Sequence, residues 1–126
     1  MGRENPLSRE IIGAAIEVHK QLGPGLLESA YETALAHEFA LRGIVFERQK
    51  PLPVIYKNVE LNCGYRLDFL VDELVVVELK AVDKLMPIPE AQVITYLKLA
   101  NCRLGLLLNF NVRLMKHGIK RVVLKL

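Results

Sequence analysis

The sequence has few of the features that mark secreted and membrane proteins. It contains only two cysteines in 126 residues, too few for a disulfide scaffold, and such a pair can equally stay reduced. Its apolar runs are only a few residues long, far short of the roughly 20 residues that cross a bilayer. The first ten residues are polar and carry both signs of charge, so we expect no signal peptide. These absences predict a cytoplasmic protein with no membrane partner.

The composition excludes disorder as the main state of the chain. Hydrophobic residues make up 52% of the sequence and charged residues 25%, which is enough apolar material to form a core. A chain of this length buries roughly two-thirds of its unfolded surface. We therefore expect residues 1–126 to form a single domain.

Positive charge is concentrated in the second half of the chain. Residues 1–63 hold 7 Lys/Arg and 8 Asp/Glu, whereas residues 64–126 hold 10 and 6. The segment from Arg113 to Lys125 contains no acid. A basic stretch of this kind suits an anionic partner such as nucleic acid, although an ordinary solvated surface would look the same.

The hydrophobic periodicity predicts a mixed sheet flanked by helices. Apolar residues recur at helical spacing in three segments, and β-branched and aromatic residues dominate from Ile44 onward. The expected helices are residues 7–22, 26–41 and 88–100. The expected strands are residues 45–50 continued by 53–56, then 59–71, 74–82, 103–110 and 119–126. The resulting order, ααβββαββ, belongs to the α/β (α+β mixed sheet) class.

Two features place the strands within this sheet. Pro51 and Pro53 interrupt the first strand and predict that it lies at an edge, because proline cannot donate to a ladder. The run from Leu74 to Val77 is apolar on both faces, which predicts a central strand covered on both sides.

The chemically informative residues are Asp68, Glu78 and Lys80. In a strand, Glu78 and Lys80 point to the same face, roughly 7 Å apart. Charges on an otherwise apolar central strand need a partner, because unpaired buried charge is costly. A metal ion or a solvent-filled cleft would supply one, and a structural ion pair is the alternative.

The turn between the second and third strands decides whether Asp68 joins Glu78. If Val71 pairs with Leu74, Asp68 opposes Val77 and faces away from Glu78. If Val71 pairs with Val75 across a three-residue loop, Asp68 opposes Glu78 directly. A shared site therefore requires an odd-length loop or a bulge.

Two carboxylates beside a lysine suit phosphodiester hydrolysis. Carboxylates are hard oxygen ligands for Mg²⁺ or Mn²⁺. Such an ion polarises a phosphoryl oxygen and lowers the pKa of a bound water. A neighbouring lysine can orient that water or stabilise the developing negative charge.

Two helical motifs accompany the acids. Residues 25–31 form a G-x-x-E-x-x-Y pattern that places Glu28 and Tyr31 on one helix face, and Gln92 and Tyr96 share a face four residues apart. Each residue also has a structural interpretation. Glu28 could be a first-turn acid favoured by the helix dipole, and the tyrosines could be core residues with hydrogen-bonded hydroxyls.

Together these motifs resemble the GxxExxY protein family, a branch of the PD-(D/E)XK nuclease superfamily, over nearly the whole chain. The segments that carry the resemblance are residues 18–19, 22–32, 49–53, 65–68, 77–82, 90–92 with 96–97, and 109–110. The resemblance implies a restriction-endonuclease-like core in which Asp68 and Glu78 bind the metal. It further implies that the Leu79 carbonyl is a ligand and that Glu28 completes the site.

The expected function is therefore a Mg²⁺- or Mn²⁺-dependent nuclease acting on DNA (or RNA), and we expect it to form a homodimer. Lys80 would activate water, and five residues would place the substrate: Gln92, Tyr96, Tyr31, Lys120 and Arg121. Two alternatives remain open. One is an inactive module that binds nucleic acid or a protein, and the other is an enzyme that uses the same site on a small phosphate-containing substrate.

Overall fold

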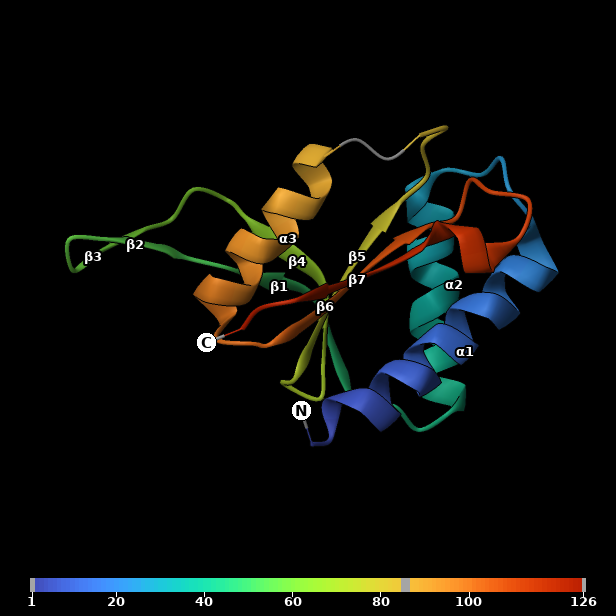
Figure 1. Cartoon of the computed structure of the whole chain (residues 1–126), viewed down its shortest axis with the longest axis horizontal. Helices are drawn as coiled ribbons and strands as arrows, with labels where there is room; N and C mark the ends of the chain where they lie inside the picture. Colours follow the sequence, from blue (N-terminus) through green and yellow to red (C-terminus); the bar gives the residue numbers. More distant parts are fainter. Residues whose placement is uncertain (1, 85–86, 126) are drawn as a thin grey trace.

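A five-stranded mixed sheet lies between two layers of helices in the computed structural model, which describes residues 2–84 and 87–125 (Figure 1). The strands run in the order β1-β4-β5-β6-β7. Their bounds are β1 Phe46–Pro51, β4 Arg66–Val71, β5 Val75–Lys80, β6 Leu104–Asn109 and β7 Ile119–Val123. Helices α1 (Glu4–Leu22) and α2 (Glu28–Leu41) cover one face, and α3 (Pro87–Ala100) covers the other. The predicted α/β fold is confirmed.

The strand pairing explains why β5 and β6 are the most buried strands. They pair in parallel, and α3 forms the crossover between them. Every residue of β6 is buried, as expected for a strand with helices on both faces. The other neighbours in the sheet pair antiparallel. The predictions that the strand over residues 45–50 lies at an edge and that β5 is central are both confirmed. Its predicted continuation over residues 53–56 is wrong, because residues 54–56 belong to a separate two-stranded sheet.

The prediction of one continuous strand over residues 59–71 is wrong. The segment divides into β3 (Val59–Leu61), which pairs with β2 (Val54–Tyr56), and β4. Lys57 and Asn58 both have positive φ, of 49° and 66°, as a tight two-residue hairpin turn requires. Gly64, with φ of 76°, lies in the segment that connects the hairpin to β4. We call residues 54–61 the arm, because this hairpin projects beyond the body of the molecule (Figure 1).

Smaller differences concern the ends of elements. Helix α1 begins at Glu4, three residues before its predicted start, and β5 ends at Lys80 instead of residue 82. Strand β7 ends at Val123, and Leu126 lies outside the described residues. Among the described residues, no helix is long and apolar enough to cross a membrane.

The short 3-10 helix η1 (Met115–Gly118) packs tightly against the end of β6. A Cβ atom added at Gly118 would lie 2.0 Å from the backbone oxygen of Asn109. Gly118→Ala should therefore lower the free energy of unfolding by about 3 kcal/mol or more in urea denaturation, because backbone must shift. Gly13→Ala in α1 is the control. There the nearest atom is a flexible Arg42 nitrogen at 3.2 Å, and helix propensity favours alanine. Equal stability of the two variants would contradict the prediction.

Candidate active site

The turn between β4 and β5 sets the two acids opposite each other. Val71 pairs with Val75 across a three-residue loop, and Phe69 pairs with Val77. Asp72 and Glu73 adopt positive φ of 50° and 57° within this loop. Of the two registers compatible with the sequence, the structure has the one that places Asp68 opposite Glu78.

Asp68 and Glu78 hold each other through reciprocal bonds between side chain and backbone. The Asp68 amide donates to Glu78 Oε1 over 3.0 Å, and the Leu79 amide donates to Asp68 Oδ2 over 2.8 Å. The carboxylates thus continue the pairing beyond Phe69 and Val77, where the ladder of paired residues ends. We call Asp68 and Glu78 the acid pair.

The acid pair brings two carboxyl groups together in a place with little water. Glu78 is only 7% exposed. Burial raises its pKa to about 9, and the charge of Asp68 adds to the effect while Lys80 opposes it. In the absence of a cation, Glu78 therefore holds a proton at neutral pH. A divalent cation beside it would favour the charged carboxylate instead.

The donor set of this site fits Mg²⁺ or Mn²⁺. Both are hard cations that take carboxylate and carbonyl oxygens, and Mg²⁺ commonly binds one or two carboxylates and keeps several waters. Within residues 2–84 and 87–125, no third Asp, Glu, His or Cys joins the acid pair to make a larger cluster. Glu28 is exposed at the first turn of α2 and is not brought to the acids.

Lys80 lies at the end of β5, where two contacts fix the backbone. Its carbonyl accepts a hydrogen bond from the Phe110 amide at 2.9 Å. The buried Asn109 side chain donates to the Val82 carbonyl at 2.8 Å and accepts from the Val82 amide at 3.1 Å. Lys80 shares a strand face with Glu78 because side chains alternate. Asn109 thus supports the segment that carries the lysine, a role that the sequence analysis did not assign.

Gln49 and Glu32 link α2 to the acid pair, and the sequence analysis missed both as site residues. The Gln49 side-chain amide donates to Asp68 Oδ1 over 3.2 Å and to Glu32 Oε1 over 2.5 Å. Arg48 holds Glu32 in an ion pair at 2.7 Å. Gln49 reaches both because it adopts a φ of 52° within the edge strand. In the sequence, the one indication of a role for Gln49 is its position in residues 49–53, a segment that carries the family resemblance.

Gln92 and Tyr96 lie on α3 beside the acid pair. Tyr96 is 7% exposed and packs in the cluster that contains Leu67 and Val76, which neighbour the two acids along their strands. Burial raises the pKa of Tyr96, and the charges of Glu78 and Asp68 raise it further. Gln92 is exposed one helical turn earlier and lines a pocket together with Tyr96.

Lys120 and Arg121 point to opposite faces of the sheet. Lys120 pairs with Leu107, and Leu107 pairs with Glu78. Lys120 therefore lies in the same row of residues across the sheet as Glu78, two strands and about 10 Å away from it. Its ammonium group is 3.8 Å from Glu90 of α3. Arg121 donates hydrogen bonds to Ser8 and Asn5 of α1 instead. The structure therefore brings Lys120, but not Arg121, to the face of the acid pair.

Tyr31 lies in the core and not beside the acid pair. Its hydroxyl donates to the Gly23 carbonyl at 2.6 Å and accepts from the Leu26 amide at 3.1 Å. Its ring stacks on Phe110 with centroids 4.7 Å apart. These contacts match the structural interpretation of Tyr31 as a core residue with a hydrogen-bonded hydroxyl. Tyr31 fixes the turn between α1 and α2.

Comparison with known proteins agrees with this geometry. No curated protein and no solved structure matches the chain. A family model described as the PD-(D/E)XK nuclease superfamily matches residues 5–122. The match spans the acid pair, Lys80 and every helix that surrounds them. The chain belongs to the PD-(D/E)XK nuclease superfamily.

Proposed function

We propose that this protein is a divalent-metal-dependent nuclease of the GxxExxY branch that hydrolyses phosphodiester bonds in DNA or RNA. The observation that carries the proposal is the reciprocally bonded acid pair with Lys80 on the same strand face. Superfamily membership supports nucleic acid as the substrate class. The residues of the site, and not the fold, are the basis for the proposed activity.

Asp68, Glu78 and the Leu79 carbonyl would hold Mg²⁺ or Mn²⁺. When bound, such an ion polarises a phosphoryl oxygen and lowers the pKa of a coordinated water. The protein's own part is to present two carboxylates at fixed positions. The Leu79 amide and the Gln49 side chain restrain Asp68, and the Asp68 amide restrains Glu78.

Lys80 is the proposed water-orienting and charge-stabilising group. Hydrolysis joins a water oxygen to phosphorus, breaks the bond to the leaving oxygen and delivers a proton to that oxygen. As an ammonium group, Lys80 has three donors and no acceptor. It can therefore orient the attacking water or stabilise the charge that develops on the phosphoryl oxygens. Tyr96, Gln92 and Lys120 would contact the substrate from the α3 side.

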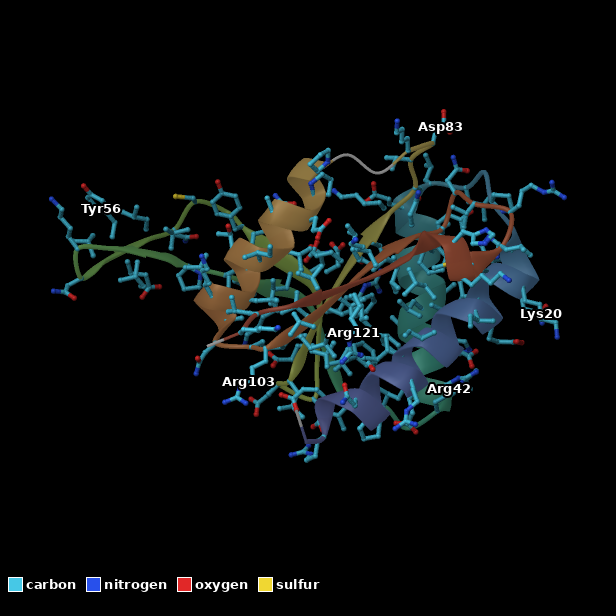
Figure 2. All side chains as sticks on the ribbon, viewed as in Figure 1. Lys20, Arg42, Tyr56, Asp83, Arg103 and Arg121 are labelled. Carbon is cyan, nitrogen blue, oxygen red and sulfur yellow. The ribbon has the colours of Figure 1, made fainter. Side chains whose placement is uncertain are left out.

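Cleavage assays with matched lysine variants test the proposal. Wild-type protein should cleave single- or double-stranded DNA or RNA in Mg²⁺ or Mn²⁺ and not in EDTA. Lys80→Ala should lower the rate by about 100-fold or more, because a preorganised donor is lost. Lys20→Ala removes an exposed lysine in the last turn of α1, at the edge of the molecule (Figure 2), and should match the wild type. Metal-dependent cleavage that is unchanged in Lys80→Ala would reject the assignment.

A pair of glutamate variants in α2 tests which helix acid supports the site. Glu32 reaches Asp68 through Gln49, whereas Glu28 is exposed one turn earlier. Glu32→Gln should reduce kcat/KM by about 10- to 100-fold, the usual effect of losing a group that orients a metal ligand. Glu28→Gln should have a smaller effect, within a few-fold. A larger loss in Glu28→Gln would instead support Glu28 as the acid that completes the metal site.

A second candidate is a non-catalytic module that binds nucleic acid or a protein. One observation favours it: only two acids come together among the described residues. Such a module would bind nucleic acid with strongly salt-dependent affinity and show no turnover in any divalent metal. Cleavage that depends on Lys80 excludes it.

Homodimer formation is a further part of the proposal. A domain of this size offers little surface for binding a duplex. Leu27, which precedes α2, and Leu41, its last residue, are exposed, and a second copy could cover these leucines. Sedimentation analysis should show a dimer at micromolar concentration. A monomer at all concentrations would contradict the proposed homodimer.

A further inference from the structure

Gln92 and Tyr96, two of the residues proposed to contact the substrate, line a pocket between the base of the arm and α3. Its volume is about 350 Å³, and six residues line it: Val54, Tyr65, Gln92, Thr95, Tyr96 and Leu99. The volume lies at the small end of the range for ligand sites in proteins. The pocket therefore suits one planar ring system and is too small for a stacked base pair.

Two tyrosines give this pocket an aromatic wall. The Tyr65 and Tyr96 rings are 6.3 Å apart and inclined by 62°, in an edge-to-face arrangement. Tyr65 is 46% exposed, whereas Tyr96 is nearly buried. The backbone of Tyr65 is fixed, because its carbonyl accepts a hydrogen bond from the Leu52 amide at 2.8 Å. The Tyr65 backbone is thus held in place, and its ring leaves surface open for stacking.

The remaining lining residues suit a ring with a polar edge. Val54 and Leu99 are apolar, while the exposed Gln92 and Thr95 provide donors and acceptors at the mouth. A nucleobase has this combination of an apolar face and a hydrogen-bonding edge. Single-stranded nucleic acids are recognised by stacking on aromatic side chains together with hydrogen bonds to base edges.

The pocket adjoins the acid pair through Tyr96. That ring packs in the same cluster as Leu67, the chain neighbour of Asp68, and Val76, two residues before Glu78 on the same strand. A nucleotide whose base entered the pocket would therefore have its backbone near the carboxylates. In a duplex, bases stay stacked and paired, so only an unpaired base can enter a separate pocket.

We propose that the pocket between Tyr65 and Tyr96 binds an unpaired nucleobase next to the phosphodiester held at Asp68 and Glu78. The preferred substrate is then a single strand or a frayed end, not an intact duplex. The inference rests on the proposed function for the position of the phosphate. The stacking itself can be measured without cleavage.

Binding to a single-stranded DNA oligonucleotide containing 2-aminopurine tests the pocket. Affinity is measured by fluorescence anisotropy in EDTA and in Ca²⁺, and stacking by quenching of 2-aminopurine. Tyr65→Ala should weaken single-strand binding by about 5- to 100-fold, the range for loss of one base–aromatic stack, and should reduce the quenching. Tyr65→Phe keeps the ring and should restore both. Binding to a blunt duplex should change little in either variant.

Two further variants keep the test decisive. Thr95→Tyr, at an exposed position on α3, would fill the pocket without altering Tyr65 and should cause the same loss. Tyr56→Ala removes an exposed tyrosine of the arm (Figure 2) outside the pocket and should leave the quenching intact. The inference is overturned if the wild type binds no single strand in either buffer, or if Tyr65→Ala binds normally. An equal loss on the blunt duplex also overturns it.

The outcome is distinguishable from failure of the nuclease assignment. Single-strand binding that depends on Tyr65, without cleavage in any metal, would support the pocket and reject the nuclease. Cleavage that depends on Lys80, with normal single-strand binding by Tyr65→Ala, would reject the pocket and keep the nuclease.

Discussion

Asp68→Asn should lower kcat/KM by about 1,000-fold or more in Mg²⁺ or Mn²⁺ while the protein stays folded. A divalent ion contributes several kcal/mol of charge stabilisation to a phosphoryl transition state, and about 4 kcal/mol corresponds to this factor. Asparagine keeps the shape of the side chain but removes its charge, so the acid pair would lose half of its metal-binding charge. Initial rates on the best substrate measure the effect.

The fold should survive this substitution because each hydrogen bond of Asp68 has a substitute. An asparagine oxygen can still accept from the Leu79 amide, which now donates to Asp68 Oδ2 over 2.8 Å. The Gln49 amide can rotate to present its oxygen to the new amide nitrogen, at the cost of its bond to Glu32. We expect a change in the free energy of unfolding of about 1 kcal/mol or less in EDTA.

Asp72→Asn is the matched control for this prediction. Asp72 lies in the turn of the same hairpin, pairs with Arg3 and is away from the acid pair. Its positive φ is one that asparagine adopts readily. The control should retain wild-type kcat/KM. Calorimetric titration with Mn²⁺ should show weaker binding in Asp68→Asn alone, and wild-type affinity in that variant would contradict the role of Asp68 as a ligand.

The sequence could define the acid pair only as one of two registers. Strand β5 is apolar on both faces, so hydrophobic alternation does not choose its register against β4. The choice depends on Asp72 and Glu73, which both adopt left-handed conformations in a three-residue turn. Neither residue is glycine, the usual signal for such a turn. The pattern could state that an odd-length loop is required but could not show that one forms.

The arm was missed for a related reason. Val59 and Leu61 have the residue types of a strand, and without packing information they read as a continuation of the strand that follows. In the structure they are exposed and pair only within the hairpin. Strand propensity describes a residue's fit to a pleated surface and does not indicate which sheet it joins.

The sequence pattern also could not predict how α2 supports the acid pair. Tyr31, Leu35 and Phe39 form the buried stripe of α2. This spacing predicts the helix and its buried side, but it does not show whether Glu28 or Glu32 reaches the acid pair. The link from Glu32 to Asp68 further requires the backbone kink at Gln49, which residue types do not signal.

Glu78→Gln should stabilise the metal-free protein, and the gain should grow with pH. The folded pKa of Glu78 is about 9 and its ordinary value is 4.5, so the folded state holds a proton that the unfolded state releases. Because the folded pKa is raised, the stability contributed by this group is fully present below pH 4.5. It declines as pH rises and levels off above about 9. Glutamine is a neutral isostere and has no such decline.

The expected difference is about 3 kcal/mol at neutral pH and close to zero near pH 4, since each pH unit above the unfolded pKa costs about 1.4 kcal/mol. Urea denaturation in EDTA across this range measures it, and other titrating groups cancel in the difference between the two proteins. Glutamine can still accept from the Asp68 amide through its oxygen, so the hydrogen bond at 3.0 Å is retained.

Glu73→Gln and added metal complete the test. Glu73 is exposed in the turn of the same hairpin, and its substitution should leave the wild-type pH dependence in place. Mg²⁺ or Mn²⁺ should stabilise the wild type more than Glu78→Gln, because a ligand that binds only the folded state adds its binding free energy to folding. The metal would then offset the free-energy cost of burying an ionised Glu78. Parallel stability curves for wild type and Glu78→Gln in EDTA would show that Glu78 is already ionised in the folded protein, and that its charge is balanced without a metal.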